Sequence, residues 1–127
     1  VDPVMEQNNA IYREQSILVQ ELAEKSDCVI VGRSADYILR DKNPLRLFIY
    51  ADMESRMERC RKRAPEQEHF TDKELRRHIQ DVDKRRSKYY QFFTGQTWGE
   101  KLNYDLCINT SGANIEELVK VIAKLVK

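Results

Sequence analysis

The chain has 127 residues, a length that suits one domain with a hydrophobic core. Charged residues make up 34% of it and the formal net charge is +1, which is typical of a soluble surface of mixed sign. No apolar stretch approaches the ~20 residues of a membrane-spanning helix, so composition excludes a membrane protein of that class.

The first part of the chain predicts two helices and two strands in alternation. Residues 5–25 carry apolar side chains at helical spacing among Glu, Gln and Arg. Residues 28–32 form a short apolar run rich in β-branched side chains, as expected of a buried parallel strand. A short helix over 35–40 ends before Pro44, and residues 45–51 form the second apolar strand.

The middle of the chain predicts two helices joined by a loop. The first helix ends near residue 63, and residues 64–70 contain proline and several polar side chains. Thr71 and Glu74 match a capping box, which opens a long helix that should continue to residue 93.

The last part predicts one strand and one helix. Residues 104–109 are the third apolar run, and Asn114 with Glu117 caps a helix over 115–126. The alternation along the chain favours an α/β fold, a parallel sheet with helices on both faces, in a single domain over residues 1–127.

The three cysteines predict a reduced environment. Cys28, Cys60 and Cys107 are odd in number and lack CxxC spacing, and two of them lie in the predicted strands. We interpret them as thiols of the core of an intracellular, cytoplasmic protein. The two histidines, His69 and His78, follow no metal-binding pattern, so no metal site is expected.

Polar residues follow each predicted strand, where the ligand of an open parallel sheet binds. Arg33 and Asp36 follow the first strand, Asp52 the second, and residues 109–111 the third. An arginine and an aspartate one turn apart could hold a phosphate or sugar hydroxyl groups. A surface Arg–Asp pair after a tight turn explains the first group equally well.

Basic residues gather in the predicted helical hairpin, residues 56–88. This segment has twelve Lys or Arg residues against seven Asp or Glu residues, so the rest of the chain is acidic. Such a distribution suits a polyanionic ligand. The alternative is a solvated face of i,i+4 ion pairs, such as Asp81 with Arg85.

Arg86 interrupts an apolar stripe of the long helix between Val82 and Tyr89. An inward guanidinium is costly unless it is paired, so we expect a carboxylate or a ligand phosphate in front of it, and we favour the phosphate. Trp98 and the tyrosines at 89 and 90 could stack on a base, although closing a core is the commoner role of such residues.

Three segments in order carry a resemblance that covers nearly the whole chain. They are Cys-Val-Ile-Val-Gly-Arg-Ser-Ala-Asp at 28–36, Asp-Lys-Arg-Arg-Ser-Lys-Tyr-Tyr at 83–90, and Thr-Gly-Gln-Thr-Trp-Gly-Glu-Lys-Leu-Asn-Tyr-Asp-Leu-Cys-Ile-Asn at 94–109. Together they resemble the cytidylate-kinase-like family of P-loop nucleoside monophosphate kinases. Residues 87–90 depart from the Arg and Asp alternation of classical cytidylate kinase, which leaves the acceptor nucleotide open.

The resemblance implies phosphoryl transfer from ATP to CMP or a similar monophosphate, with Mg²⁺, in a P-loop NTPase fold. The basic hairpin over 56–88 would be a mobile lid that closes over the phosphates. The implied catalytic residues are Arg59, Arg85 and Arg86. The implied substrate-binding residues are Arg33, Asp36, Arg56 and Arg63, and the loop near the adenine of ATP would be Asn109, Thr110 and Ser111.

The glycine-rich loop of such kinases is missing from the sequence. Its four glycines fit no GxxxxGK[ST] pattern. We therefore interpret the chain as the C-terminal part of a kinase domain, cut at Val1 and lacking the N-terminal strands. We expect activity, with ATP and Mg²⁺, only in the intact parent, and self-association through the exposed sheet edge.

The sequence features raise two alternative functions. A short pseudo-kinase that binds a nucleotide or a partner chain without chemistry would have the same sequence features. A nucleic-acid-binding domain is disfavoured because the net charge is near zero and the arginines alternate with acids.

Overall fold

A computed structural model describes residues 3–64 and 69–126. The chain divides into two compact units, Val1–Pro44 with Phe92–Gly95, and Leu45–Gln91 with Gln96–Lys127, called here the first and the second unit. None of the helices in the described residues is long and apolar enough to cross a membrane.

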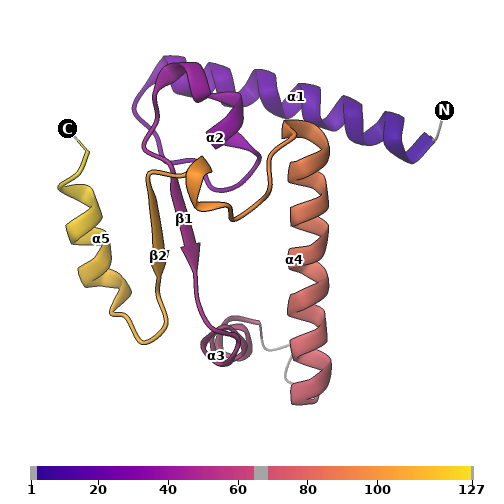
Figure 1. The fold of residues 1–127 in the computed structure, drawn as a ribbon, viewed down its shortest axis with the longest axis vertical. Helices are drawn as coiled ribbons and strands as arrows, with labels where there is room; N and C mark the ends of the chain where they lie inside the picture. Colours follow the sequence, from indigo (N-terminus) through magenta and orange to yellow (C-terminus); the bar gives the residue numbers. More distant parts are fainter. Residues whose placement is uncertain (1–2, 65–68, 127) are drawn as a thin grey trace. The chain divides into compact units, whose positions relative to one another are not determined.

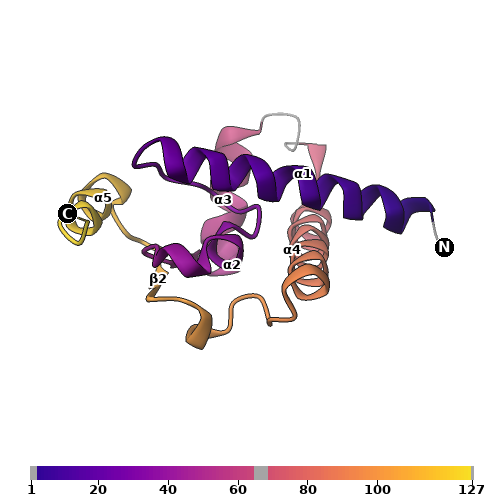
Figure 2. The same cartoon turned by 90° about the horizontal axis from the view of Figure 1, so that it is seen from above.

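The first unit is helical. Its segments are α1 (Pro3–Lys25), α2 (Ala35–Ile38) and the 3-10 turn η1 (Arg40–Lys42). Val19 of α1 is 2% exposed and packs with Ala35 and Leu39, so the two helices enclose a small core. Figure 2 shows α2 alongside α1. The ring of Tyr12 also stacks on Phe93, with 4.3 Å between ring centroids.

The strand predicted over residues 28–32 does not form. Residues 27–31 are irregular, and the side chains of Val29 and Val31 are 93% and 86% exposed. A strand needs a neighbour that accepts its hydrogen bonds, and none of the described segments pairs with this one. The β-branched composition of this segment is typical of a strand, but composition cannot supply the partner.

The second unit contains the sheet, which has two parallel strands, β1 (Leu47–Tyr50) and β2 (Leu106–Asn109). Their register pairs Leu47 with Leu106 and Tyr50 with Asn109. Just before the strands, the carboxylate of Asp105 accepts a hydrogen bond of 2.7 Å from the backbone N–H of Arg46. Figure 1 shows the two strands side by side, pointing the same way. The chain is therefore a mixed α/β protein with a small parallel sheet.

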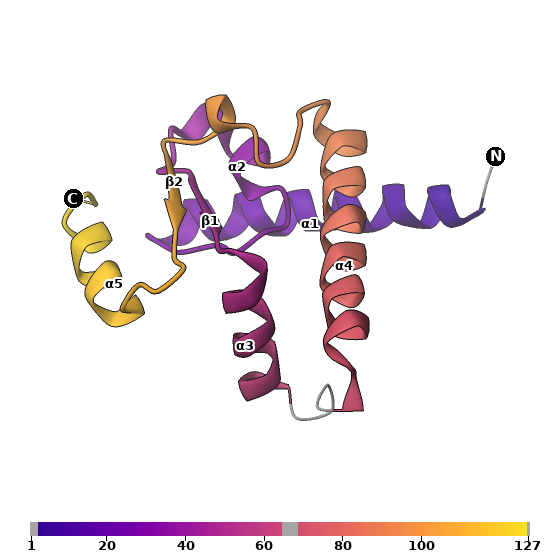
Figure 3. The ribbon, with the colours of Figure 1, turned by 60° about the horizontal axis from the view of Figure 1, so that its bottom comes forward.

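Two helices lie between the strands in sequence, α3 (Met53–Arg63) and α4 (Asp72–Thr94), and α4 belongs to the second unit up to Gln91. Met57, Leu75 and Ile79 form the core between them, and Figure 3 shows the two helices side by side. The predicted capping box is confirmed: Glu74 N–H donates to Thr71 Oγ1, and Thr71 N–H donates to the Glu74 carboxylate, both at 3.1 Å. The predicted loop over 64–70 lies partly outside the described residues, which exclude 65–68.

The prediction that Arg86 faces the core is wrong, because its side chain is 62% exposed. The buried stripe of α4 starts at Leu75 and Ile79 and reaches Tyr90 through the half-buried Asp83 and Ser87. A step of four residues is slightly more than one turn of a helix with 3.6 residues per turn, so the stripe shifts around the helix, and the apolar side chains alone did not define its path. The charged side chain on the buried stripe is therefore the carboxylate of Asp83.

The last helix, α5 (Ile115–Ala123), begins at the predicted cap. Asn114 Oδ1 accepts a hydrogen bond of 3.2 Å from Glu117 N–H. In Figures 1 and 2, α5 lies beyond β2, on the side away from α4. Its apolar side chains stay accessible, and Val119 is 58% exposed. A short 3-10 turn, η3 (Lys101–Asn103), precedes β2.

The interpretation of the cysteines as core thiols is wrong for two of them. Cys28 and Cys107 are exposed, and Cys60 is half-buried against the α3–α4 core. All three are free thiols. Cys28 begins the unpaired segment at residues 28–31, and Cys107 lies on β2, which pairs with no described strand other than β1, which explains their exposure.

Candidate functional site

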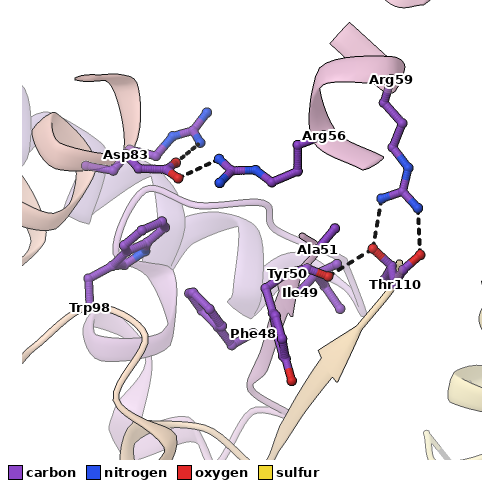
Figure 4. A pocket seen from close by; sticks show the side chains of 10 residues that line it. Phe48, Ile49, Tyr50, Ala51, Arg56, Arg59, Asp83, Trp98 and Thr110 are labelled. Atoms are coloured by element: carbon purple, nitrogen blue, oxygen red, sulfur yellow. Dashed lines mark hydrogen bonds and ion pairs between the residues drawn. The ribbon is translucent and has the colours of Figure 1, made fainter. Parts of the chain in front are cut away.

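An open pocket of about 280 Å³ lies in the second unit, where β1 ends and α3 begins. Its polar lining consists of Arg56, Arg59, Asp83, Arg86 and Thr110, and its apolar lining of Phe48, Ile49, Tyr50, Ala51 and Trp98. Figure 4 shows the arginines of α3 above the end of the sheet and the aromatic rings along the other side. The carboxyl ends of parallel strands are the usual ligand position in such sheets.

Arg59 is bonded to the residue that follows β2. Its Nη1 donates to Thr110 Oγ1 at 2.9 Å, and its Nη2 donates to the Thr110 carbonyl at 2.6 Å. Thr110 is 2% exposed and donates in turn to the carbonyl of Tyr50, through N–H at 2.7 Å and through Oγ1 at 3.0 Å. This chain of bonds attaches α3 to the ends of both strands and fixes one wall of the pocket.

Asp83 holds the other two arginines of the pocket. Its Oδ2 accepts a hydrogen bond of 2.5 Å from Arg56 on α3, and its Oδ1 accepts one of 3.2 Å from Arg86, one turn further along α4. Arg56 and Asp83 are 30% and 23% exposed. Three guanidinium groups against one carboxylate leave the lining with a formal charge of +2, so the pocket is suited to an anion.

Aromatic rings form the opposite side of the pocket. Trp98 meets Phe48 edge to face with 5.2 Å between centroids, and Tyr104 lies 5.0 Å from Phe48. A Cβ atom at Gly99 would lie 3.2 Å from the ring of Phe48, so the turn after Trp98 needs a glycine for close approach as well as for its φ of +81°. Trp98 therefore packs on the sheet and lines the pocket at the same time.

Asp52 fixes the start of α3 beside the pocket. Its carboxylate accepts a hydrogen bond of 2.7 Å from Ser55 N–H, and its own N–H donates to Ser111 Oγ at 2.7 Å. The bond from the Ser55 backbone, with smaller contributions from the Ser55 hydroxyl, Ser111 and Arg59, holds the pKa of Asp52 below its usual value. The cap predicted from the sequence is confirmed, and it orients the first turn of the helix that carries Arg56.

Four of the residues implied by the resemblance meet in this pocket: Arg56, Arg59, Arg86 and Thr110. Ser111 bonds to Asp52, and Asn109 Oδ1 accepts a hydrogen bond from Ser111 N–H. Arg63 and Arg85 are exposed on α3 and α4, outside the lining. Within residues 3–64 and 69–126, no cluster of His, Cys, Asp or Glu is suited to a metal ion.

Arg33 and Asp36 belong to the first unit, and their predicted role in binding the acceptor stays a prediction. Arg33 has φ of +59° and lies between Gly32 and Ser34, which also have positive φ. Left-handed backbone at non-glycine residues is strained. Arg33 is exposed, and Ser34 is 7% exposed at the start of α2.

Sequence reasoning did not select Asp83. It lies four residues after Ile79, on the continuation of the buried stripe, and three before Arg86, so two helical spacings pointed to it. Its partner on α3, Arg56, could not be found from spacing because 27 residues separate the two. The second unit's fold brings them together.

The chain is similar to a known protein family and to a solved structure. The cytidylate kinase-like family matches residues 4–112 of the chain. Among solved structures, an uncharacterized protein from Eubacterium ventriosum ATCC 27560 is similar, with 28% sequence identity and a TM-score of 0.81 over 94% of this chain and 73% of that one. No curated protein matches. Because the family match spans most of the sequence, the chain belongs to the cytidylate kinase-like family.

Proposed function

We propose that the pocket binds the phosphate groups of nucleotides, and that the domain serves phosphoryl transfer from ATP to CMP or a similar monophosphate. The observation that carries the proposal is the meeting of Arg56, Arg59 and Arg86, from two helices, at the end of a parallel sheet. Guanidinium groups bind phosphate oxygens through charge-assisted, often bidentate, hydrogen bonds. Membership of the cytidylate kinase-like family supports the nucleotide as the source of the phosphate.

The three arginines would have different parts in binding. Arg86 is the more accessible of the two arginines held by Asp83, so an incoming anion can reach its guanidinium with little loss of packing. Arg59 is held by Thr110 and contributes its charge from a fixed position. In phosphoryl transfer, fixed cations stabilise the negative charge that spreads over the transferred group. Mg²⁺ and ATP are proposed as cofactors of the reaction.

Isothermal titration calorimetry with CMP, ATP and uncharged cytidine tests the binding. We expect CMP and ATP to bind and cytidine to bind much more weakly, because the pocket recognises charge. Arg86→Gln should weaken CMP binding by about tenfold, equivalent to about 1.4 kcal/mol. Arg76→Gln is the matched control, since Arg76 lies on the same helix and outside this pocket. Equal binding of cytidine and CMP, or equal losses in both variants, would count against the proposal.

A second candidate function is nucleotide binding without turnover, and the absence of a GxxxxGK[ST] pattern from the 127 residues favours it for this chain. Without the backbone amides and lysine of such a loop, nothing in these residues matches the usual cradle for β and γ phosphates. A coupled assay of ADP release from ATP and CMP separates the two functions. We expect binding but no turnover by the chain alone. Turnover that Arg86→Gln abolishes would identify the chain as a complete enzyme.

A further inference from the structure

We propose that Asp83 is a positioning residue, which holds Arg56 and Arg86 in the geometry that binds phosphate. This inference rests on the proposed function of the pocket, and it assigns a role to a carboxylate that would otherwise repel the ligand. The two guanidinium groups come from different helices and carry like charges. Without a carboxylate between them they would repel each other and turn into solvent.

The geometry gives Asp83 control over both arginines. One carboxylate oxygen receives Arg56 at 2.5 Å and the other receives Arg86 at 3.2 Å, so each guanidinium has a defined direction (Figure 4 shows Arg56 pointing at Asp83). Asp83 lies on the buried stripe of α4 and is 23% exposed, whereas Arg86 is 62% exposed. The less mobile group is the carboxylate, and it therefore orders the longer side chains.

The bond between Asp83 and Arg56 also affects the rest of the pocket, because of the position of Arg56 on α3. It lies three residues before Arg59 on α3, so the Asp83 bond and the Thr110 bonds fix neighbouring positions of one helix face. Asp83 attaches that face to α4, and Thr110 attaches it to the strands. Polar contacts thus bound the pocket on two sides, and these contacts set the spacing of its cations.

Positioning and simple electrostatics predict opposite effects of Asp83→Asn. Removing the carboxylate raises the formal charge of the lining from +2 to +3, which by charge alone would tighten phosphate binding. If Asp83 positions the arginines, binding weakens despite the added positive charge, because two guanidinium groups lose their fixed directions. The sign of the change therefore identifies the role.

The probe is inorganic phosphate, and the readout is the fluorescence of Trp98, the single tryptophan of the chain, which lines the pocket. We expect phosphate to change the Trp98 emission of the wild-type chain, and Asp83→Asn to weaken the fitted affinity by at least about threefold. Asp72→Asn is the matched control. It also removes one ion pair between α4 and α3, the 2.8 Å bond from Arg61, but Asp72 does not line this pocket.

Asp83→Glu is the second variant and keeps the charge. Its longer side chain displaces both guanidinium groups, so we expect weaker binding at unchanged pocket charge, with melting temperature measured in parallel. Tighter binding by Asp83→Asn, or wild-type affinity in Asp83→Glu, would overturn the role of Asp83 and leave the phosphate site standing. No response of the wild-type chain to phosphate, CMP or ATP would instead overturn the proposed function, and the role of Asp83 with it.

Discussion

Arg59 and Thr110 are joined by two hydrogen bonds, one from each terminal nitrogen of the guanidinium, to the hydroxyl and to the carbonyl of the threonine. The bonds hold a helix to the residue that follows a strand, and Thr110 is almost completely buried. Arg59 therefore has a structural part in the second unit, beside the catalytic role that the family resemblance implies for it.

Arg59→Lys should lower the free energy of unfolding by about 1–2 kcal/mol, because a single ammonium group cannot reproduce the two-point contact with the hydroxyl and the carbonyl of Thr110. Urea denaturation followed by circular dichroism measures the change. Arg63→Lys, on the exposed end of the same helix, should change stability by less than about 0.5 kcal/mol. Equal effects of the two substitutions would mean that the Thr110 contact does not stabilise the fold.

Acid should destabilise the chain partly through Asp52. Its folded-state pKa lies below the ordinary value of 3.8, so the unfolded chain binds more protons than the folded chain around that pH. The stabilisation from this group is complete above 3.8 and is lost as the pH falls through the folded-state value. Urea denaturation at a series of pH values should show a shallower acid dependence for Asp52→Asn than for the wild type.

The control for this experiment is Asp81→Asn, which removes an exposed carboxylate from α4 away from the helix caps. It should leave most of the acid dependence in place. If Asp52→Asn follows the wild-type curve throughout, the capping bond to Ser55 does not couple folding to protonation.

Arg33→Gly should raise the free energy of unfolding by about 1 kcal/mol, because glycine adopts the left-handed backbone at φ of +59° without the steric cost that arginine bears. Asn43→Gly is the matched control: Asn43 has φ of +52°, but asparagine tolerates this region better, so the gain should be smaller. Thermal melts of both variants provide the comparison. A loss of stability in Arg33→Gly would show that its side chain makes contacts worth more than the backbone strain.

We expect the chain to self-associate with a second copy, as a dimer or a swapped assembly. Val29 and Val31 are exposed in an irregular segment that pairs with no described strand, and Ile49 is 52% exposed on a sheet of two strands. Such apolar, hydrogen-bonding edges pair with other chains unless they are covered. Light scattering at tens of micromolar should report a dimer or larger species.

Lysine at both Val29 and Val31 should shift that assembly toward the monomer, because buried like charges oppose edge pairing. Ile17→Lys on α1, also an exposed apolar position, controls for the added charge. A clean wild-type monomer with a cooperative melt would contradict the expected association.

Local signals in the sequence determined most of the secondary structure. The Thr71–Glu74 capping box and the Asp52 and Asn114 caps are satisfied by residues within three positions, so each could be read without knowing the fold. The second and third apolar runs were also correctly assigned as strands and pair in parallel. The family was identifiable because its three segments occur in order along one chain.

Tertiary structure alone decided the site. Arg56 meets Asp83 across 27 residues, and Arg59 meets Thr110 across 51, distances at which periodicity carries no information. Tertiary structure also determined that residues 28–31 form no strand. Their composition is strand-like, but they have no pairing partner among the described segments. A helix cap is completed by its own neighbours, whereas a strand or an ion pair between elements depends on what the rest of the chain brings beside it.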